Sequence, residues 1–364
     1  MTPPNNIRVA VAMSGGVDSS VAAALLVRRG FDVFGLMMRL WSEPSEGDST
    51  SAAVHNRCCT PDAMAQARNM AAQLDIPFYV LNTQDVFKRN VVDFFIEGYA
   101  SGVTPNPCLE CNRHIRWDFL LNKALDFGAT HLATGHYARV VQTNEEFELQ
   151  RAVDSHKDQS YVLSVLGQDQ LRHAMFPIGD YTKDEVRALA REFDLPVSER
   201  RDSQDLCFLA DNDYRRFLRD YAPNAMLAGA IVDTTGNQVG EHTGLAGYTI
   251  GQRKGLGIAA PEPLYVLETN TERNELVVGT LAELGGDSLH ATEINWIHGT
   301  APADEFRADV KIRYRSRALP AKITLTDYSA ANITFDEPVR DITPGQAAVI
   351  YTGEVCLGGG IIQS

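Results

Sequence analysis

The sequence predicts an α/β fold: a Rossmann-like parallel sheet with flanking helices at the N-terminus, then a small, mostly β central domain, then a C-terminal β-barrel. Two observations carry this prediction. Strand-like and helix-like stretches alternate from residue 7 to about 135, which is typical of a parallel sheet covered by helices on both faces. Beyond about residue 285 the chain contains only short strand-like stretches separated by turns, which is typical of a small barrel.

Hydrophobic spacing and turn residues define the N-terminal elements. A compact apolar run over 7–12 predicts the first strand, and the helix expected over 17–29 ends at Gly30, because glycine commonly follows a helix end. A later helix begins with Thr182 and Glu185, which have the spacing of a capping box. The same reasoning predicts strands at 31–36, 78–81 and 131–134, and helices at 62–74, 86–97, 115–126 and 182–193.

The character of the sequence changes after about residue 205. Glycines become dense and helical periodicity fades, which favours strands and turns over helices. We therefore predict three domains, over 1–205, 206–285 and 286–364. Strands of the last domain are expected at 308–314, 321–326, 347–351 and 354–357.

Composition and charge exclude several classes of protein. Hydrophobic residues make up 44% of the chain and charged residues 22%, which argues against disorder. No apolar run is long enough to span a membrane, and the N-terminus has no leader-like core, so we expect a cytoplasmic protein. The net charge of −14 argues against a protein that coats nucleic acid non-specifically, but it allows a local basic groove. Six cysteines are too few for a disulfide scaffold in a chain of this length.

A glycine loop follows the first predicted strand and precedes the first predicted helix. Glycines let the backbone approach a phosphate, and the N–H groups of the helix N-terminus face it. The loop lacks the lysine and spacing of a Walker A motif, and it is not the GxGxxG dinucleotide motif. We predict a nucleotide site in which Asp18 helps to hold Mg²⁺. The loop residues are Ala12, Met13, Ser14, Gly15, Gly16, Val17, Asp18 and Ser19.

Cys108 and Cys111 stand out among the cysteines. Two prolines precede them, and a helix is expected to start near His114. The helix N-terminus and the nearby Arg113 and Arg116 favour the thiolate, which is the nucleophilic form of cysteine.

Cys207 lies at a predicted domain junction, where clefts commonly form. It follows a polar, turn-prone segment, as Cys111 does, and neither lies in an apolar periodic run that would bury it as filler. A structural zinc site normally needs four ligands, and the chain has one C-x-x-C pair. An iron–sulfur site built from Cys108, Cys111 and Cys207 stays open as an alternative. Cys58, Cys59 and Cys356 are interpreted as structural.

A basic segment interrupts this acidic chain. Residues 307–322 hold six lysines and arginines against one aspartate. Lys311, Arg313, Arg315 and Arg317 alternate, which would place their charges on one face of a strand. Charge that keeps an edge strand soluble is one explanation. The local reversal of sign favours a stripe that tracks phosphates, with Tyr314 beside it.

Together these motifs resemble one family, the tRNA-specific 2-thiouridylases of the MnmA type, within the ATP pyrophosphatase (PP-loop) superfamily. The resemblance covers nearly the whole chain, and the motifs occur in the same order. It implies that the N-terminal domain is adenine nucleotide alpha hydrolase-like and binds ATP, and that the C-terminal barrel contacts tRNA. The motifs lie at 13–20, 106–112, 134–139, 157–161, 202–208, 248–257, 313–315, 344–346 and 353–360.

The resemblance implies a two-stage reaction. ATP would adenylate the carbon-2 oxygen of the wobble uridine, and a persulfide on Cys207 would deliver sulfur. Cys111 would act as the nucleophile that completes the transfer and leaves a Cys111–Cys207 disulfide. A sulfur-relay protein or a cysteine desulfurase would charge Cys207, and the enzyme would act as a monomer.

The resemblance also assigns binding residues. Met38 and Gly135 join the glycine loop as adenosine contacts. Asn106, Pro107 and Cys108 would face the target base, although many family members have aspartate at the position of Cys108. The implied tRNA contacts are His136, Lys157, Asp158, Gln159, Arg313, Tyr314 and Gln346.

Other interpretations remain open at the level of sequence. His136 would serve equally as a hydrogen-bonded residue at a strand end, and 157–159 as a solvated loop. An ATP pyrophosphatase that acts on a small molecule would need neither the basic segment nor the distant cysteine pair. A non-enzymatic RNA-binding or metal-sensing protein would fail to bind ATP.

Overall fold

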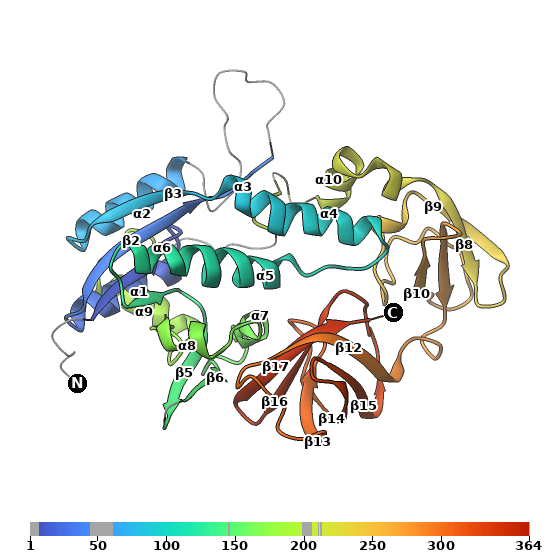
Figure 1. Cartoon of the computed structure of the whole chain (residues 1–364). Coiled ribbons are helices and arrows are strands. Elements are labelled where there is room, and N and C mark those ends of the chain that lie inside the picture. The colour runs from blue at the N-terminus through green and yellow to red at the C-terminus, as the bar shows by residue number, and fades with distance from the viewer. Residues whose placement is uncertain are drawn as a thin grey trace.

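The computed structural model of the chain (Figure 1) describes residues 7–43, 61–144, 146–198, 206–209, 211 and 213–363. A parallel sheet forms the N-terminal part. Its strands are β1 (Arg8–Ala12), β2 (Asp32–Arg39), β3 (Phe78–Asn82), β4 (His131–Ala133) and β7 (Ala174–Met175), in the order β3-β2-β1-β4-β7. Every pairing in this sheet is parallel, which confirms the predicted Rossmann-like architecture.

Helices cover both faces of the parallel sheet. Val9 and Val11 of β1 face the core that contains α1 (Val17–Arg28), α2 (Pro61–Gln73) and α9 (Lys183–Glu192). Ala10, between them, faces the opposite core, as expected for alternating side chains. Thr182 and Glu185 form the predicted capping box at the start of α9. The other face packs against α5 (Pro107–Glu110), η2 (Cys111–Leu120) and α6 (Leu121–Asp126). A separate apolar cluster beyond the end of β2 contains residues of α3 (Gln84–Phe87), η1 (Lys88–Val92) and α4 (Asp93–Ala100).

The central part is a separate, mostly β unit, as predicted. Its strands are β8 (Gly229–Asp233), β9 (Gln238–His242), β10 (Tyr265–Asn270) and β11 (Glu275–Gly279), in the order β10-β11-β8-β9, with the short helices η3 (Pro223–Met226) and η4 (Leu245–Gly247). The expectation that helical structure fades after residue 205 was wrong for α10 (Tyr214–Tyr221). This helix is only eight residues long, and its buried residues are Phe217 and Leu218, so its apolar period is too short to recognise.

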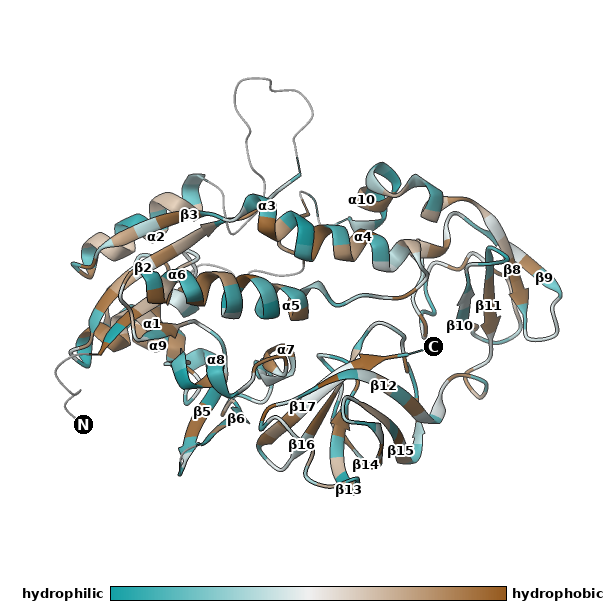
Figure 2. Ribbon diagram, in the orientation of Figure 1, coloured by the Kyte–Doolittle hydropathy of each residue, from teal (hydrophilic) through white to brown (hydrophobic). Residues whose placement is uncertain are grey.

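The C-terminal part is a closed β-barrel. β12 pairs with both β15 and β17, and this second pairing closes the sheet on itself. The barrel strands are β12 (Gly286–Trp296), β13 (Glu305–Lys311), β14 (Leu319–Asp327), β15 (Ala330–Val339), β16 (Ala347–Thr352) and β17 (Val355–Ile362). Figure 2 shows hydrophobic stretches along β2 and β17, in keeping with buried strands in both sheets.

A hairpin joins the barrel sheet to the N-terminal part. It consists of β5 (Ala138–Thr143) and β6 (Glu146–Arg151), and the sequence analysis did not predict it. Leu149 of β6 pairs with Cys356 of β17, so the eight-stranded sheet crosses the domain boundary. The connection onward contains α7 (Ser160–Leu163) and α8 (Gln168–His173), and Tyr161 is buried in a core shared with the barrel residue Tyr351.

The predicted strand over 308–314 was wrong at its end. β13 stops at Lys311, and the backbone N–H of Ser316 donates to the carbonyl of Arg313 at 3.1 Å, which closes a turn. The alternating cations therefore do not share one strand face. Alternating side chains form a strand only where neighbouring strands supply backbone hydrogen bonds. Here the pairing of β13 with β14 and β16 ends at Lys311. Within the described residues, no helix has the length and hydropathy needed to cross a membrane.

Candidate active site and RNA-facing surface

The glycine loop lies at the carboxyl edge of the parallel sheet, where α/β proteins bind ligands. β1 ends at Ala12, and Gly16 is the N-cap of α1, with no side chain capping that helix. Gly15 has a φ of +72°, and a Cβ there would lie 2.5 Å from the Ala63 carbonyl oxygen. Only glycine fits this turn, so the backbone forms an open cradle at a helix N-terminus.

Asp18, in the first turn of α1, points its carboxylate at Lys183. The Lys183 Nζ lies 2.7 Å from Asp18 Oδ1 and 3.0 Å from Oδ2, and the Tyr137 hydroxyl donates to Oδ1 at 2.9 Å. The Lys183 side chain is only 10% exposed. Sequence reasoning missed Lys183. A lysine at the first position of a helix opposes the helix dipole, and that mismatch was the available signal that it needs an anionic partner.

Of the two other predicted ATP contacts, Gly135 borders the same loop and Met38 lies at the same edge of the sheet. A Cβ on Gly135 would lie 2.7 Å from the backbone nitrogen of Ser19, so the 134–136 segment passes close to the start of α1. Met38 lies near the end of β2 and packs against cores on two sides. The structure therefore gathers the predicted ATP residues at one sheet edge.

Cys111 and Cys207 belong to one apolar cluster. Cys111 is 6% exposed and is packed among Phe87, Phe95 and Phe208, while the half-buried Cys207 packs against the same cluster. The structure shows no disulfide between them. The expectation that neither cysteine is buried among apolar residues was therefore wrong for Cys111, because polar neighbours in sequence do not determine which side of a helix faces a core.

The remaining cysteines fall into three cases. Cys356 is fully buried in β17, and burial raises the pKa of its thiol well above the usual range, which confirms a structural role. Cys108 is exposed at the residue level, yet desolvation of its thiol by the surrounding protein raises the pKa to about 11, and the neighbouring Cys111 adds to the rise. The predicted thiolate at Cys108 was therefore wrong. Cys58 and Cys59 lie outside the described residues.

Arg116 lowers the pKa of the Cys108 thiol, but burial and the neighbouring Cys111 raise it by more, so the thiolate is not favoured. Other side chains also engage Arg113 and Arg116. The Arg113 guanidinium donates to Glu110 at 3.1 Å, and that of Arg116 donates to Asn112 at 3.3 Å. Across the part of the chain that the structure describes, no three His, Cys, Asp or Glu side chains gather as metal ligands. Cys108, Cys111 and Cys207 thus do not present the three-thiolate geometry of an iron–sulfur site.

The predicted base-facing residues meet the barrel. Asn106 caps α5 by accepting from the Cys108 N–H at 3.2 Å, and Pro107 is the first residue of the helix. Tyr314 lies opposite: burial raises the pKa of its hydroxyl, and Asp158 and Cys108 add to the rise. The Lys311 Nζ lies 5.7 Å from the Tyr314 ring centre, within cation–π range.

Tyr161 is buried beneath Tyr314, and the sequence analysis assigned Tyr161 no role. Its ring centre lies 6.2 Å from that of Tyr314, and its hydroxyl donates to the Ala347 carbonyl at 3.0 Å. The Lys311 Nζ also lies 5.8 Å from the Tyr161 ring centre. The short Ser160–Leu163 helix that carries Tyr161 gave no periodic signal in the sequence.

Several predicted tRNA contacts are engaged within the protein. The buried carboxylate of Asp158 accepts hydrogen bonds from Ala152 and Ser160, and the Gln159 Oε1 accepts from the Tyr137 N–H at 2.9 Å. The Lys157 backbone N–H donates to Asp154, which fixes the turn before them. The Asp158 and Gln159 side chains therefore shape the loop from within rather than pointing freely to solvent.

Arg313 and Gln346 hold elements together at the junction of the three parts. Arg313 donates to the Ile250 carbonyl at 2.9 Å and to the Thr343 hydroxyl. The Gln346 Nε2 donates to the Thr104 carbonyl at 2.8 Å and so ties the barrel to the segment before Asn106.

His136 is buried and neutral. Its Nδ1 lies 2.7 Å from the Thr134 hydroxyl oxygen, and burial, aided by the nearby Arg116, lowers its pKa well below the usual value. Of the interpretations open for His136, the structure favours the hydrogen-bonded strand-end residue.

A parallel sheet with a Ser-Gly-Gly-Val-Asp-Ser loop at its carboxyl edge defines an ATP-using enzyme of the PP-loop class. Family models match residues 7–211 (tRNA methyl transferase HUP domain), 215–280 (tRNA methyl transferase PRC-barrel domain) and 286–362 (aminomethyltransferase β-barrel domain). The chain belongs to the family of tRNA-specific 2-thiouridylases of the MnmA type.

Its similarity to curated members extends over nearly the full length. It is 45% identical to the tRNA-specific 2-thiouridylase MnmA of Carboxydothermus hydrogenoformans over 98% of this chain and 97% of the relative. It is 46% identical to that of Chloroflexus aurantiacus over 97% and 98%. Among solved structures, the U34-tRNA thiolase NcsA of Methanococcus maripaludis, with its iron–sulfur cluster, matches 61% of this chain and 69% of its own, at 20% identity and a TM-score of 0.35.

Proposed function

We propose that this enzyme converts the wobble uridine of tRNA to 2-thiouridine by ATP-dependent adenylation followed by sulfur transfer from Cys207. One observation carries the proposal: the end of β2 lies between the glycine loop and the cluster that contains both cysteines. Met13 at the loop donates its N–H to the Leu36 carbonyl of β2 at 2.8 Å, and Leu40, just beyond β2, is buried with Cys111. The nucleotide loop and the two cysteines therefore lie at the same edge of the parallel sheet.

The first stage activates a poor leaving group. The carbon-2 oxygen of uridine attacks the α-phosphate of ATP, pyrophosphate departs, and the N3 proton is lost to give the adenylated base. The glycine cradle and the N-terminus of α1 stabilise the phosphates. Asp18 and the loop fit Mg²⁺, because a carboxylate beside a phosphate cradle is the usual donor set for this ion. The ion supplies charge neutralisation on the pyrophosphate.

The second stage exchanges oxygen for sulfur. The terminal sulfur of a Cys207 persulfide attacks carbon 2, and AMP departs to leave the base joined to Cys207 through two sulfurs. The Cys111 thiolate then attacks the Cys207 sulfur, which releases 2-thiouridine and forms a Cys111–Cys207 disulfide. A two-electron reductant restores both thiols, and a persulfide carrier, either a sulfur-relay protein or a cysteine desulfurase, recharges Cys207.

The tRNA meets the protein where the α5 N-terminus faces the barrel. Asn106, Pro107 and Cys108 border the space for the target base, and the exposed Tyr314 offers a ring for stacking. Asp158, Gln159 and Gln346 act by holding the contacting segments, since their side chains are already hydrogen-bonded. We also propose that Lys157 contacts the tRNA backbone, that Arg313 and His136 shape this surface from within, and that the enzyme acts as a monomer.

Mass spectrometry of tRNA nucleosides tests the proposal directly. Unmodified tRNA is incubated with the protein, ATP, Mg²⁺, and a cysteine desulfurase with cysteine, and 2-thiouridine is expected at the wobble position. Cys207→Ser is the matched control and should form AMP without 2-thiouridine. AMP formation that does not depend on tRNA would favour a small-molecule substrate instead. Absence of 2-thiouridine with every persulfide carrier would overturn the proposal.

A further inference from the structure

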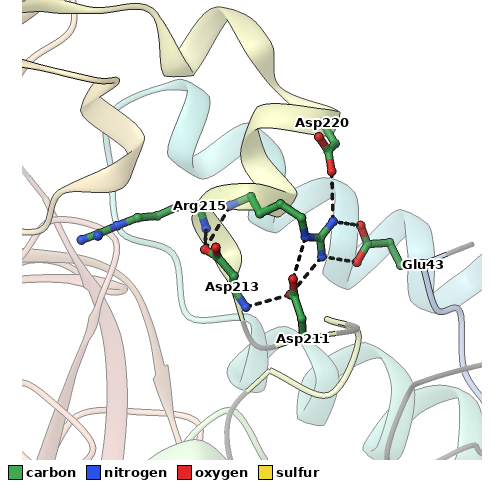
Figure 3. A network of polar contacts seen from close by, with 6 residues as sticks. Glu43, Asp211, Asp213, Arg215 and Asp220 are labelled. Atoms are coloured by element: carbon green, nitrogen blue, oxygen red, sulfur yellow. Dashed lines mark hydrogen bonds and ion pairs between the residues drawn. The ribbon is translucent and has the colours of Figure 1, made fainter. Parts of the chain in front are cut away.

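A single guanidinium lies among three carboxylates beside the cysteine cluster. Figure 3 shows Glu43, Asp211 and Asp220 directed at this group, which belongs to Arg216 of α10. Arg216 Nη2 donates to Glu43 Oε2 at 2.6 Å, Nε donates to Asp211 Oδ2 at 2.9 Å, and Nη1 donates to Asp220 Oδ2 at 3.0 Å. Nη1 also reaches the second oxygen of Glu43, and Nη2 that of Asp211, so all five N–H donors of the arginine are used.

The carboxylates come from three different places in the chain. Glu43 lies just beyond the end of β2, and its side chain is 7% exposed. Asp211 lies shortly after Cys207, and the hydrogen bonds from Arg216 lower the pKa of its carboxyl to about 2. Asp220 lies on α10 itself. The guanidinium therefore connects the end of β2 with the segment that carries Cys207.

Apolar contacts join the same segments, but they define the relative position of these segments less closely. The Phe208 ring lies 5.7 Å from that of Phe217 on α10 and 5.2 Å from that of Phe95 on α4. The ring centre of Trp41, two residues before Glu43, lies 6.4 Å from that of Phe217. Burial of apolar surface is not directional, whereas paired bonds from a planar guanidinium constrain both distance and orientation.

We propose that Arg216 is a positioning residue that fixes the Cys207 segment against the end of β2, so that the sulfur of Cys207 is held in register with the nucleotide site. The inference depends on the role proposed above for Cys207. Arg216 is assigned no part in the chemical steps. Arg216 acts by binding Asp211, and its own position is fixed by the buried Glu43 carboxylate.

Two carboxylates on the same guanidinium provide a matched pair of variants. Asp211→Ala releases the Cys207 segment but leaves the buried Glu43 paired with Arg216. Asp220→Ala removes a carboxylate of similar exposure, 55% against 48%, whose bond to Arg216 stays within α10. Arg216→Met would remove the guanidinium from the buried Glu43 carboxylate and risk misfolding, so the two aspartate variants carry the test.

The experiment measures single-turnover thiolation by full-length enzyme that carries a preformed persulfide, together with ATP affinity and the thermal unfolding midpoint. Asp211→Ala should lower the transfer rate constant by about tenfold, since small misplacements of a reacting group have effects of this order. Its ATP affinity should be unchanged. Asp211→Ala should also slow the formation of the Cys111–Cys207 disulfide in a glutathione redox buffer, where oxidised glutathione is the oxidant, while Asp220→Ala should match wild type in every readout.

Equal transfer rates in the two variants would overturn the positioning role. A loss of rate that tracks the unfolding midpoint equally in both variants would overturn it too, because it would indicate general destabilisation. A wild-type enzyme that makes no 2-thiouridine would instead contradict the proposed function, and that outcome is recognised before either variant is compared.

Discussion

The ammonium of Lys183 contacts both carboxylate oxygens of Asp18, at 2.7 Å and 3.0 Å. These residues lie in the first turns of two different helices, α9 and α1, that pack on the same face of the parallel sheet. A nearly buried lysine needs a counter-charge, and the loop carboxylate provides it. The pair therefore gives Asp18 a structural role in addition to its proposed role at the nucleotide.

Replacing Asp18 should separate these two roles. Asp18→Ala should abolish AMP formation, because the phosphate site loses its carboxylate. It should also lower the free energy of unfolding by about 1–3 kcal/mol, because the Lys183 ammonium loses its charged partner. The double variant Asp18→Ala/Lys183→Met should recover part of that stability in urea unfolding, since it leaves no buried charge. Normal AMP production by Asp18→Ala would remove the loop from catalysis.

The cysteine variants should fail at different steps. Cys111→Ser and Cys207→Ser should each prevent 2-thiouridine formation while ATP binding persists, because neither thiol belongs to the nucleotide loop. Only Cys207→Ser should lose the protein-bound persulfide, detected by a persulfide-specific label and peptide mapping. Cys356→Ser serves as the control, because its thiol is enclosed in the barrel strand. A label found on Cys111 and never on Cys207 would reverse the assigned roles.

Salt titrations of tRNA affinity should distinguish contact residues from structural arginines. Arg315 and Arg317 are exposed in the turn after β13, and Ala at each should reduce the salt slope by about 0.7–0.9 per lost phosphate contact. Arg313→Ala should instead lower the unfolding midpoint, because its guanidinium binds Ile250 and Thr343. Unchanged tRNA affinity in Arg315→Ala/Arg317→Ala at low salt would show that these charges serve solubility.

The buried, neutral His136 should make the enzyme less stable in mild acid. Its pKa is lowered on folding, so below about pH 6.5 the unfolded chain binds a proton that the folded chain excludes. Stability is thus present above that pH and falls as the pH decreases, by up to about 1.4 kcal/mol per pH unit for this one group. His136→Gln should flatten the fall in urea titrations between about pH 6.5 and 5. A parallel pH dependence in both proteins would contradict the assignment.

Local patterns predicted the layout of the chain well. The apolar run before the glycine loop, the Gly30 helix end and the Thr182–Glu185 capping box each involve residues close in sequence, so their geometry follows from nearest neighbours. Motif resemblance identified the loop and the two distant cysteines. The same local reasoning missed α10 and the β5–β6 hairpin, because short elements are stabilised by what they pack against.

Sequence by itself determined the parallel sheet, the glycine loop, the closing barrel and the family, since these depend on residue order and short-range chemistry. Tertiary structure alone decided the burial of Cys111, the pairing of Lys183 with Asp18 and the use of Arg216, Arg313 and Gln346 as connectors. These features depend on which surfaces meet after folding. Burial and charge pairing between residues far apart in the chain are set by that packing, because a side chain's pKa and exposure reflect its neighbours in space.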